Sequence, residues 1–262
     1  MKVLFMGRKK IAAECLEYLL LDPAIHVVGV MTDSHTDHSP TKEIANRHKL
    51  PLLTLESARN LLKKGSLHFD IAFSMLYWRI LDRSFLDAAK YGIVNFHPAP
   101  LPAYKGVGGY NLAVLHSLKS WSVTAHYMDE SIDTGPIISD ISFPLDTATE
   151  TAQSIERLSQ RYLKDLFERV VSQTLAFPSD IQTRENVGGD YLSRKDLEAM
   201  KEVDISVDDI DRKIRAFWFP PYDGAYIRMQ GKKYTLTNRR ILEDLADANV
   251  SPLFVPSDDD SD

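Results

Sequence analysis

Residues 93–102 read Ile-Val-Asn-Phe-His-Pro-Ala-Pro-Leu-Pro and combine an apolar strand with a stiff exit. The first five are mostly β-branched or aromatic and stop at Pro98, which predicts a short buried strand over Ile93–His97. Because side chains alternate along a strand, Asn95 and His97 point to the same side. An amide and an imidazole therefore stand at the C-terminal end of this strand, where open α/β sheets bind ligands.

A carboxylate follows in a second strand–turn–strand pattern. Trp121–Met128 is predicted to be a strand, residues 129–136 a turn ending in Gly-Pro, and Ile137–Ile141 the next strand. This turn can bring Asp133 to His97. Asn, His and Asp in one cleft suit the transfer of an acyl group to an amine. The amide donates to an oxyanion, the imidazole donates or moves a proton, and the carboxylate orients the imidazole and accepts the amine's proton.

The alternative for Asn95 and His97 is a hydrogen-bonded core pair without catalysis. Against it, the pair is followed by a proline-rich exit, a glycine-rich loop and a Ser-Ile-Asp-Thr-Gly-Pro turn at 131–136. Together these resemble the folate-dependent formyltransferases, which carry Asn-x-His-Pro-x-x-Leu-Pro followed by an Asp-x-Gly loop. The resemblance spans roughly residues 1–180 and implies that Asn95, His97 and Asp133 are catalytic.

The same resemblance implies that the formyl donor is N10-formyltetrahydrofolate. Residues 69–75 are predicted to form another buried strand, and the loop that follows it leads directly to the Asn95 strand. In the family, the equivalent loop binds the pterin through its main chain. The residues expected at the folate are Tyr77, Arg79, Leu81, Asp129 and Asp133.

The N-terminus predicts a Rossmann-like α/β fold, with a mostly parallel sheet and helices on both faces. Lys2–Met6 and His26–Met31 are predicted strands that flank a helix over Ile11–Leu21. Only one glycine follows the first strand, so there is no dinucleotide-binding fingerprint. The turn before the helix contains Arg8, Lys9 and Lys10, which either bind a phosphate or form a solvated basic turn.

Beyond residue 146, the pattern Thr147-x-x-Glu150 predicts a capping box at the start of the longest helix, which extends to about Leu175. Its apolar stripe contains Ile155, Leu158, Tyr162, Leu166 and Val170, and its charged side is expected to face solvent. Residues 178–190 are the predicted domain boundary. We expect a catalytic domain at 1–185, a small subdomain with a helix and a β-hairpin at 186–257, and a disordered acidic tail at 258–262.

Residues 217–225 read Phe-Trp-Phe-Pro-Pro-Tyr-Asp-Gly-Ala. This stretch and the short C-terminal part resemble the sugar N-formyltransferases. That likeness implies an acceptor of the dTDP-4-amino-4,6-dideoxyhexose type, expected to be the glucose isomer, in bacterial lipopolysaccharide O-antigen synthesis. The residues expected to bind it are Arg8, Lys9, Lys105, Gly108, Trp218, Phe219 and Tyr222. The aromatic residues could instead form an edge of the core.

Other acceptors and roles stay open. A methionyl-tRNA formyltransferase shares the motif but has a longer, basic C-terminal domain, and a glycinamide-ribotide enzyme would leave residues 191–262 unexplained. A non-catalytic ligand-binding module on the same scaffold is the alternative from another class. The net charge of −6 argues against nucleic acid as a partner.

Composition gives several further expectations. No apolar run reaches the ~18 residues of a membrane span, so we expect a cytoplasmic protein without a membrane partner. Cys15 is the only cysteine and is expected to be buried. Residues 33–38 lack distal partners for a metal, and no metal is expected. His116 and His126 are expected to be structural, and the aromatic residues near Tyr222 predict a homodimer.

Overall fold

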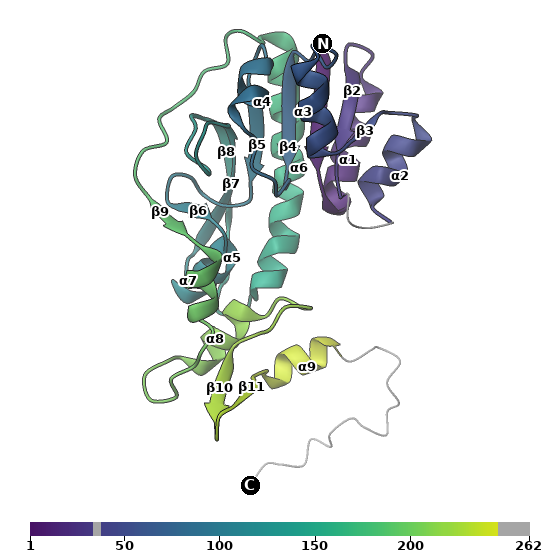
Figure 1. Cartoon of the computed structure of the whole chain (residues 1–262). Helices are drawn as coiled ribbons and strands as arrows, with labels where there is room; N and C mark the ends of the chain where they lie inside the picture. Colours follow the sequence, from purple (N-terminus) through teal and green to yellow (C-terminus); the bar gives the residue numbers. More distant parts are fainter. Residues whose placement is uncertain (34–37, 246–262) are drawn as a thin grey trace.

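A seven-stranded sheet forms the centre of the fold, in the order β3-β2-β1-β4-β5-β7-β8 (Figure 1). The computed structural model describes residues 1–33 and 38–245. β1 to β5 run parallel, and β7 and β8 continue the sheet antiparallel. The predicted Rossmann-like, mostly parallel sheet is confirmed. Its strands are β1 (Lys2–Gly7), β2 (His26–Met31), β3 (Leu52–Leu53), β4 (Ile71–Met75), β5 (Ile93–His97), β7 (Ser120–Tyr127) and β8 (Ile137–Pro144).

Helices cover both faces of this sheet (Figure 1). Alternate residues of β1 supply the two cores: Val3 and Phe5 pack into one, and Leu4 and Met6 into the other. The first core is closed by α1 (Lys9–Leu21), α2 (Pro40–Arg47), α5 (Gly109–Leu115) and α6 (Ala152–Ala176). The second is closed by α3 (Leu55–Lys63) and α4 (Arg83–Ala88).

β5 has the predicted bounds and the predicted facing. Val94 and Phe96 are buried in the first core, where the Phe96 ring lies 5.0 Å from the Phe167 ring of α6, centroid to centroid. Asn95 and His97 therefore point away from α6, at the end of the strand that precedes the prolines. The polar pair stands on a strand anchored in the centre of the sheet.

The start of α6 differs from the prediction. Thr147 does not cap the helix, because its hydroxyl donates to the Leu118 carbonyl oxygen at 3.1 Å. The capping box is formed by Thr151 and Ser154, and the helix begins at Ala152. Two threonine-led patterns follow each other here, at 147–150 and 151–154. The backbone of Asp146 holds a turn over the first pattern, so the helix begins after the second threonine. Of the predicted apolar stripe, Ile155, Leu166 and Val170 are buried and Leu158 and Tyr162 are half-buried.

The C-terminal part contains the predicted helices and β-hairpin. One segment of it, residues 184–194, returns to the catalytic half and is called the strap here. Strap residues Asp190–Leu192 form β9, which pairs in parallel with β6 (Tyr104–Gly106), and Arg184 pairs with Ile137 of β8. The remaining elements are α7 (Arg194–Ala199), α8 (Ile210–Phe217), β10 (Tyr226–Met229), β11 (Lys232–Thr235) and α9 (Arg239–Leu245).

The two predicted domains therefore share strand pairing, and the division at residue 185 stays a prediction. The tail predicted at 258–262 lies outside the described residues. Among the helices of residues 1–33 and 38–245, none combines the length and the apolarity that a bilayer crossing requires.

Candidate active site

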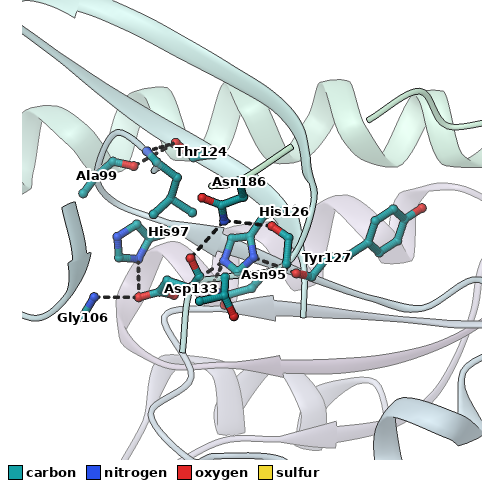
Figure 2. Close-up of polar contacts among 12 residues, drawn as sticks. Asn95, His97, Ala99, Gly106, Thr124, His126, Tyr127, Asp133 and Asn186 are labelled. Carbon is teal, nitrogen blue, oxygen red and sulfur yellow. Dashed lines mark hydrogen bonds and ion pairs between the residues drawn. The ribbon is translucent and has the colours of Figure 1, made fainter. Parts of the chain in front are cut away.

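Strand pairing brings the first two polar side chains of the site together. β5 and β7 run antiparallel, with Asn95 directly opposite His126. Across this pair the Asn95 side-chain amide, Nδ2, donates to His126 Nε2 at 3.1 Å. His126 was expected to be only structural, yet its ring is buried beside the site and contacts both Asn95 and Asp133 (Figure 2).

The second nitrogen of His126 fixes the orientation of the Asn95 amide. Nδ1 lies 2.7 Å from the Tyr127 carbonyl oxygen, which can only accept, so the ring proton is on Nδ1. Nε2 is then the acceptor for one N–H of Asn95. The second N–H of the same amide is left for another acceptor, and this is the donor that an oxyanion requires.

His97 lies between two acceptors. Its Nε2 donates to the Tyr104 carbonyl oxygen at 2.8 Å, and its Nδ1 lies 3.4 Å from Oδ2 of Asp133. A neutral imidazole has one N–H and satisfies only one of them, whereas the charged ring satisfies both. Burial opposes the charge and outweighs the support from Asp133 and the carbonyl, so the pKa of His97 is lowered. The ring is neutral at pH 7 and ready to take a proton beside a carboxylate.

Asp133 closes the site from the turn between β7 and β8. Oδ2 accepts from the backbone N–H of Gly106 at 2.9 Å, and Oδ1 lies 3.6 Å from His126 Nε2. Burial acts to raise the pKa of this carboxyl, but the histidine rings, when they carry a proton toward it, and the Gly106 amide outweigh burial and lower the pKa. Asp133 is therefore a carboxylate at neutral pH, held against His97.

A cavity of about 500 Å³ opens onto Asn95, His97 and Asp133. All the residues expected at the folate line it: Tyr77, Arg79, Leu81 and Asp129, together with Asp133. Of the residues expected at the acceptor, Arg8 and Lys9 also line it. One cavity thus joins Asn95, His97 and Asp133 to the loop 76–81 and to the turn before α1.

The other residues expected at the acceptor lie outside this lining. The Lys105 ammonium donates to the Gly188 carbonyl oxygen of the strap at 2.7 Å. Gly108 precedes α5 with φ at +77°, where a Cβ would meet the Leu197 side chain. The Lys9 ammonium lies over the Phe219 ring. Trp218 directly precedes Phe219 in the chain, and Tyr222 follows it by three residues and is two-thirds exposed. Their role at the acceptor stays a prediction.

Four further residues line the cavity and were not predicted from the sequence: Tyr110, Glu156, Tyr191 and Arg194. Glu156 belongs to the side of α6 that was expected to face solvent, and that prediction is wrong for it. Its side chain is 12% exposed and forms an ion pair with Lys9. Lys9 itself adopts a left-handed backbone with φ at +68°, an uncommon conformation for a lysine that often accompanies function.

The basic turn before α1 is already occupied by protein partners. Besides the pair between Lys9 and Glu156, Arg8 lies 3.7 Å from Asp33 and stacks 5.0 Å from the centre of the Trp78 ring. Lys10 contacts Glu14, with its own side chain 84% exposed. Each of the three cations thus lies near a carboxylate, whereas the buried Arg8 Nε has no hydrogen-bond partner within the described residues.

Over residues 1–33 and 38–245, His, Cys, Asp and Glu side chains form no group that could hold a metal ion. Most of the loop considered for a metal, residues 34–37, lies outside the described residues.

Comparison with known proteins then assigns the chain. The sequence profile described as Formyl transferase matches residues 1–171. The chain belongs to the formyl transferase family. The matched range contains Asn95, His97 and Asp133, so the predicted family resemblance is confirmed, and the protein is an N-formyltransferase that takes its formyl group from a formyl-folate.

Relatives of this formyltransferase have names that point to different formyl acceptors. A methionyl-tRNA formyltransferase of Clostridioides difficile (strain 630) is 26% identical over 273 residues, covering 99% of this chain and 86% of that protein. A 4-N formyltransferase structure from Francisella tularensis has a TM-score of 0.75 at 18% identity, covering 90% of this chain and 96% of that one.

A third relative of this formyltransferase is the structure of a complex with two ligands. The N-formyltransferase from Helicobacter canadensis, in complex with folinic acid and dTDP-3-aminofucose, has a TM-score of 0.70 at 24% identity, and covers 89% of this chain and 86% of that one. At these identities the solved structures establish the fold that the formyltransferase shares with them.

Proposed function

We propose that this formyltransferase moves a formyl group from N10-formyltetrahydrofolate to the amine of a dTDP-linked amino-dideoxy sugar. The preferred acceptor is dTDP-4-amino-4,6-dideoxyglucose. The observation that carries the proposal is the convergence of Asn95, His97 and Asp133 on one cavity of about 500 Å³. Cavities of this size suit a small molecule.

In this proposal the sugar amine attacks the formyl carbon. The second N–H of Asn95 donates to the oxyanion that forms, since the first is held by His126. Asp133 lies 3.4 Å from His97 and stabilises the imidazolium when His97 takes the proton released by the attacking amine. The proton is then available for the departing folate nitrogen.

The wall of the cavity supports a sugar as acceptor. The Glu156 carboxylate accepts hydrogen bonds from hydroxyl groups, which a sugar ring carries on several carbons. Arg194 lines the same cavity and provides a cation for a phosphate. The Francisella tularensis and Helicobacter canadensis structures, named for 4-N transfer and for a complex with dTDP-3-aminofucose, support the same class of acceptor.

Methionyl-tRNA is the second candidate acceptor, favoured by the Clostridioides difficile relative. The net charge of −6 does not favour it, because a tRNA-binding enzyme needs cations to neutralise phosphates. Affinity for tRNA that falls steeply with salt would support this candidate.

A panel of acceptors tests the proposal. The protein is incubated with N10-formyltetrahydrofolate and, separately, with dTDP-4-amino-4,6-dideoxyglucose, a dTDP-3-amino sugar, the free amino sugar, methionyl-tRNA and glycinamide ribotide. Products are identified by mass spectrometry. We expect the 4-amino nucleotide sugar to have the highest kcat/KM, and the free sugar to be very poor because remote binding energy is lost. Equal kcat/KM for the free and the dTDP-linked sugar, or preference for methionyl-tRNA, would overturn the proposed acceptor.

A further inference from the structure

The strap, residues 184–194, contains a buried asparagine that contacts the catalytic turn. Asn186 is 8% exposed, although its neighbours Glu185 and Val187 are exposed. Its side-chain amide donates to the carbonyl oxygen of Asp133 at 3.0 Å and to that of Gly135 at 2.9 Å (Figure 2). Both N–H groups of one side chain thus bind the backbone on either side of Thr134.

This turn needs an external support because of its backbone conformation. Asp133 is left-handed, with φ at +57°, a region that is uncommon for residues other than glycine. At Gly135 a Cβ would lie 1.9 Å from the Tyr127 carbonyl oxygen, so the chain passes very close to β7. The carboxylate of Asp133 reaches His97 only while the turn holds this conformation.

The strap also holds the other partner of the carboxylate. Oδ2 of Asp133 accepts from the N–H of Gly106, and Gly106 lies in β6 opposite Leu192 of the strap. The strap therefore fixes the turn through Asn186 and fixes the Gly106 donor through β9. Two independent contacts from one distant segment set where the carboxylate lies.

We propose that Asn186 is a positioning residue for formyl transfer, which acts by holding the turn that presents Asp133 to His97. The inference rests on the proposed catalytic role of Asp133 and extends it to a segment beyond the family match at residues 1–171. Asn186 lies too far along the chain to be a local feature of the turn, 53 residues beyond Asp133. Its only hydrogen bonds in the described residues are those to the turn.

The first test measures the turn without any substrate. Hydrogen exchange of the whole protein is compared between the parent, Asn186→Ala and the matched control Glu185→Ala, which changes the exposed neighbour. We expect faster exchange of residues 129–136 in Asn186→Ala alone, since local opening becomes easier. Asn186→Asp, which has the same shape and lacks both donors, gives the same readout if the alanine variant does not fold.

The second test uses steady-state kinetics with N10-formyltetrahydrofolate and dTDP-4-amino-4,6-dideoxyglucose. We expect kcat to fall about ten- to a hundredfold in Asn186→Ala, with the folate KM nearly constant, because a small misplacement at the reacting centre costs about that much. In the Asp133→Asn background, Asn186→Ala should add little further loss, since both changes act through one carboxylate.

Unchanged exchange of the turn, or a loss of kcat that multiplies with that of Asp133→Asn, would overturn the role of Asn186. Failure of the proposed function is a separate result. It would be seen in the parent enzyme, as no turnover of this acceptor, or in Asp133→Asn, as full activity. In either case the exchange experiment still reports whether Asn186 holds the turn.

Discussion

Replacing Asp133 by Asn removes one charge from the site and preserves its shape. The Asn oxygen can still accept from the Gly106 N–H, which lies 2.9 Å from Oδ2 in the parent. The new NH2 group would replace Oδ1, which in the parent lies 3.6 Å from His126 Nε2 and forms no hydrogen bond with it. We therefore expect the variant to fold, with a melting temperature close to that of the parent.

The size of the kinetic effect follows from the distance between Asp133 and His97. Their side chains approach to 3.4 Å and are both about nine-tenths buried. At an effective dielectric constant of about 20, unit charges at this distance attract by about 5 kcal/mol. Every 1.4 kcal/mol or so is a factor of about ten in rate. Because part of that attraction survives as an amide dipole, we expect kcat to fall by about 10²- to 10³-fold.

The assay is formation of the formylated dTDP-4-amino sugar at saturating donor and acceptor. The matched control is Asp87→Asn, an exposed carboxylate on α4 that pairs with Arg83 at the surface, and its kcat should equal that of the parent. A folded Asp133→Asn enzyme with kcat within about threefold of the parent would refute the prediction. It would show that the attraction between the Asp133 charge and the protonated His97 contributes little to the rate.

Three further predictions follow from the same geometry. Burial lowers the pKa of His97, so the unfolded chain binds the proton of this ring more tightly than the folded chain does. The free energy of unfolding should therefore fall as the pH drops below about 6.5. Urea titrations at several pH values should show a smaller dependence of the unfolding free energy on pH in His97→Gln. Glu156→Gln should raise the acceptor KM about tenfold and leave the folate KM unchanged in steady-state kinetics, whereas the reverse pattern would move the acceptor elsewhere. Gly135→Ala should lower both kcat and the melting temperature, because its Cβ would overlap the Tyr127 carbonyl, while Gly65→Ala, with open space around it, should cost only about 1 kcal/mol of stability.

The sequence was sufficient to predict the centre of the site. β5 has the predicted bounds, because an apolar strand ended by proline is a local signal. The turn at Asp133 was found for a similar reason, since Gly135-Pro136 marks a turn directly before β8 begins at Ile137. Alternation along one strand and one turn placed the three side chains together, and the resemblance to the formyltransferases indicated a catalytic role for them.

The rest of the site depends on contacts that no local pattern encodes. His126 joins the site because β7 pairs antiparallel with β5, and strand order is a property of the whole sheet. Glu156 was expected in solvent, and its burial follows from where α6 passes α1. Asn186 lies in a segment that reads only as a polar linker. Each of these residues can be assigned to the site only from the residue that it contacts in the folded structure.

The strap also contacts the outer edge of the central sheet, where another chain could pair. The central sheet ends at β3, which is only two residues long, and at β8, which is eight residues long. A long outer strand exposes unpaired N–H and C=O groups on which another chain can add. Arg184 of the strap pairs with Ile137 through both backbone hydrogen bonds, and its guanidinium forms an ion pair with Asp140 farther along β8. Release of the strap would therefore free the backbone groups of Ile137, at the start of β8, for pairing with another chain, so the segment that positions Asp133 also protects one end of this outer strand.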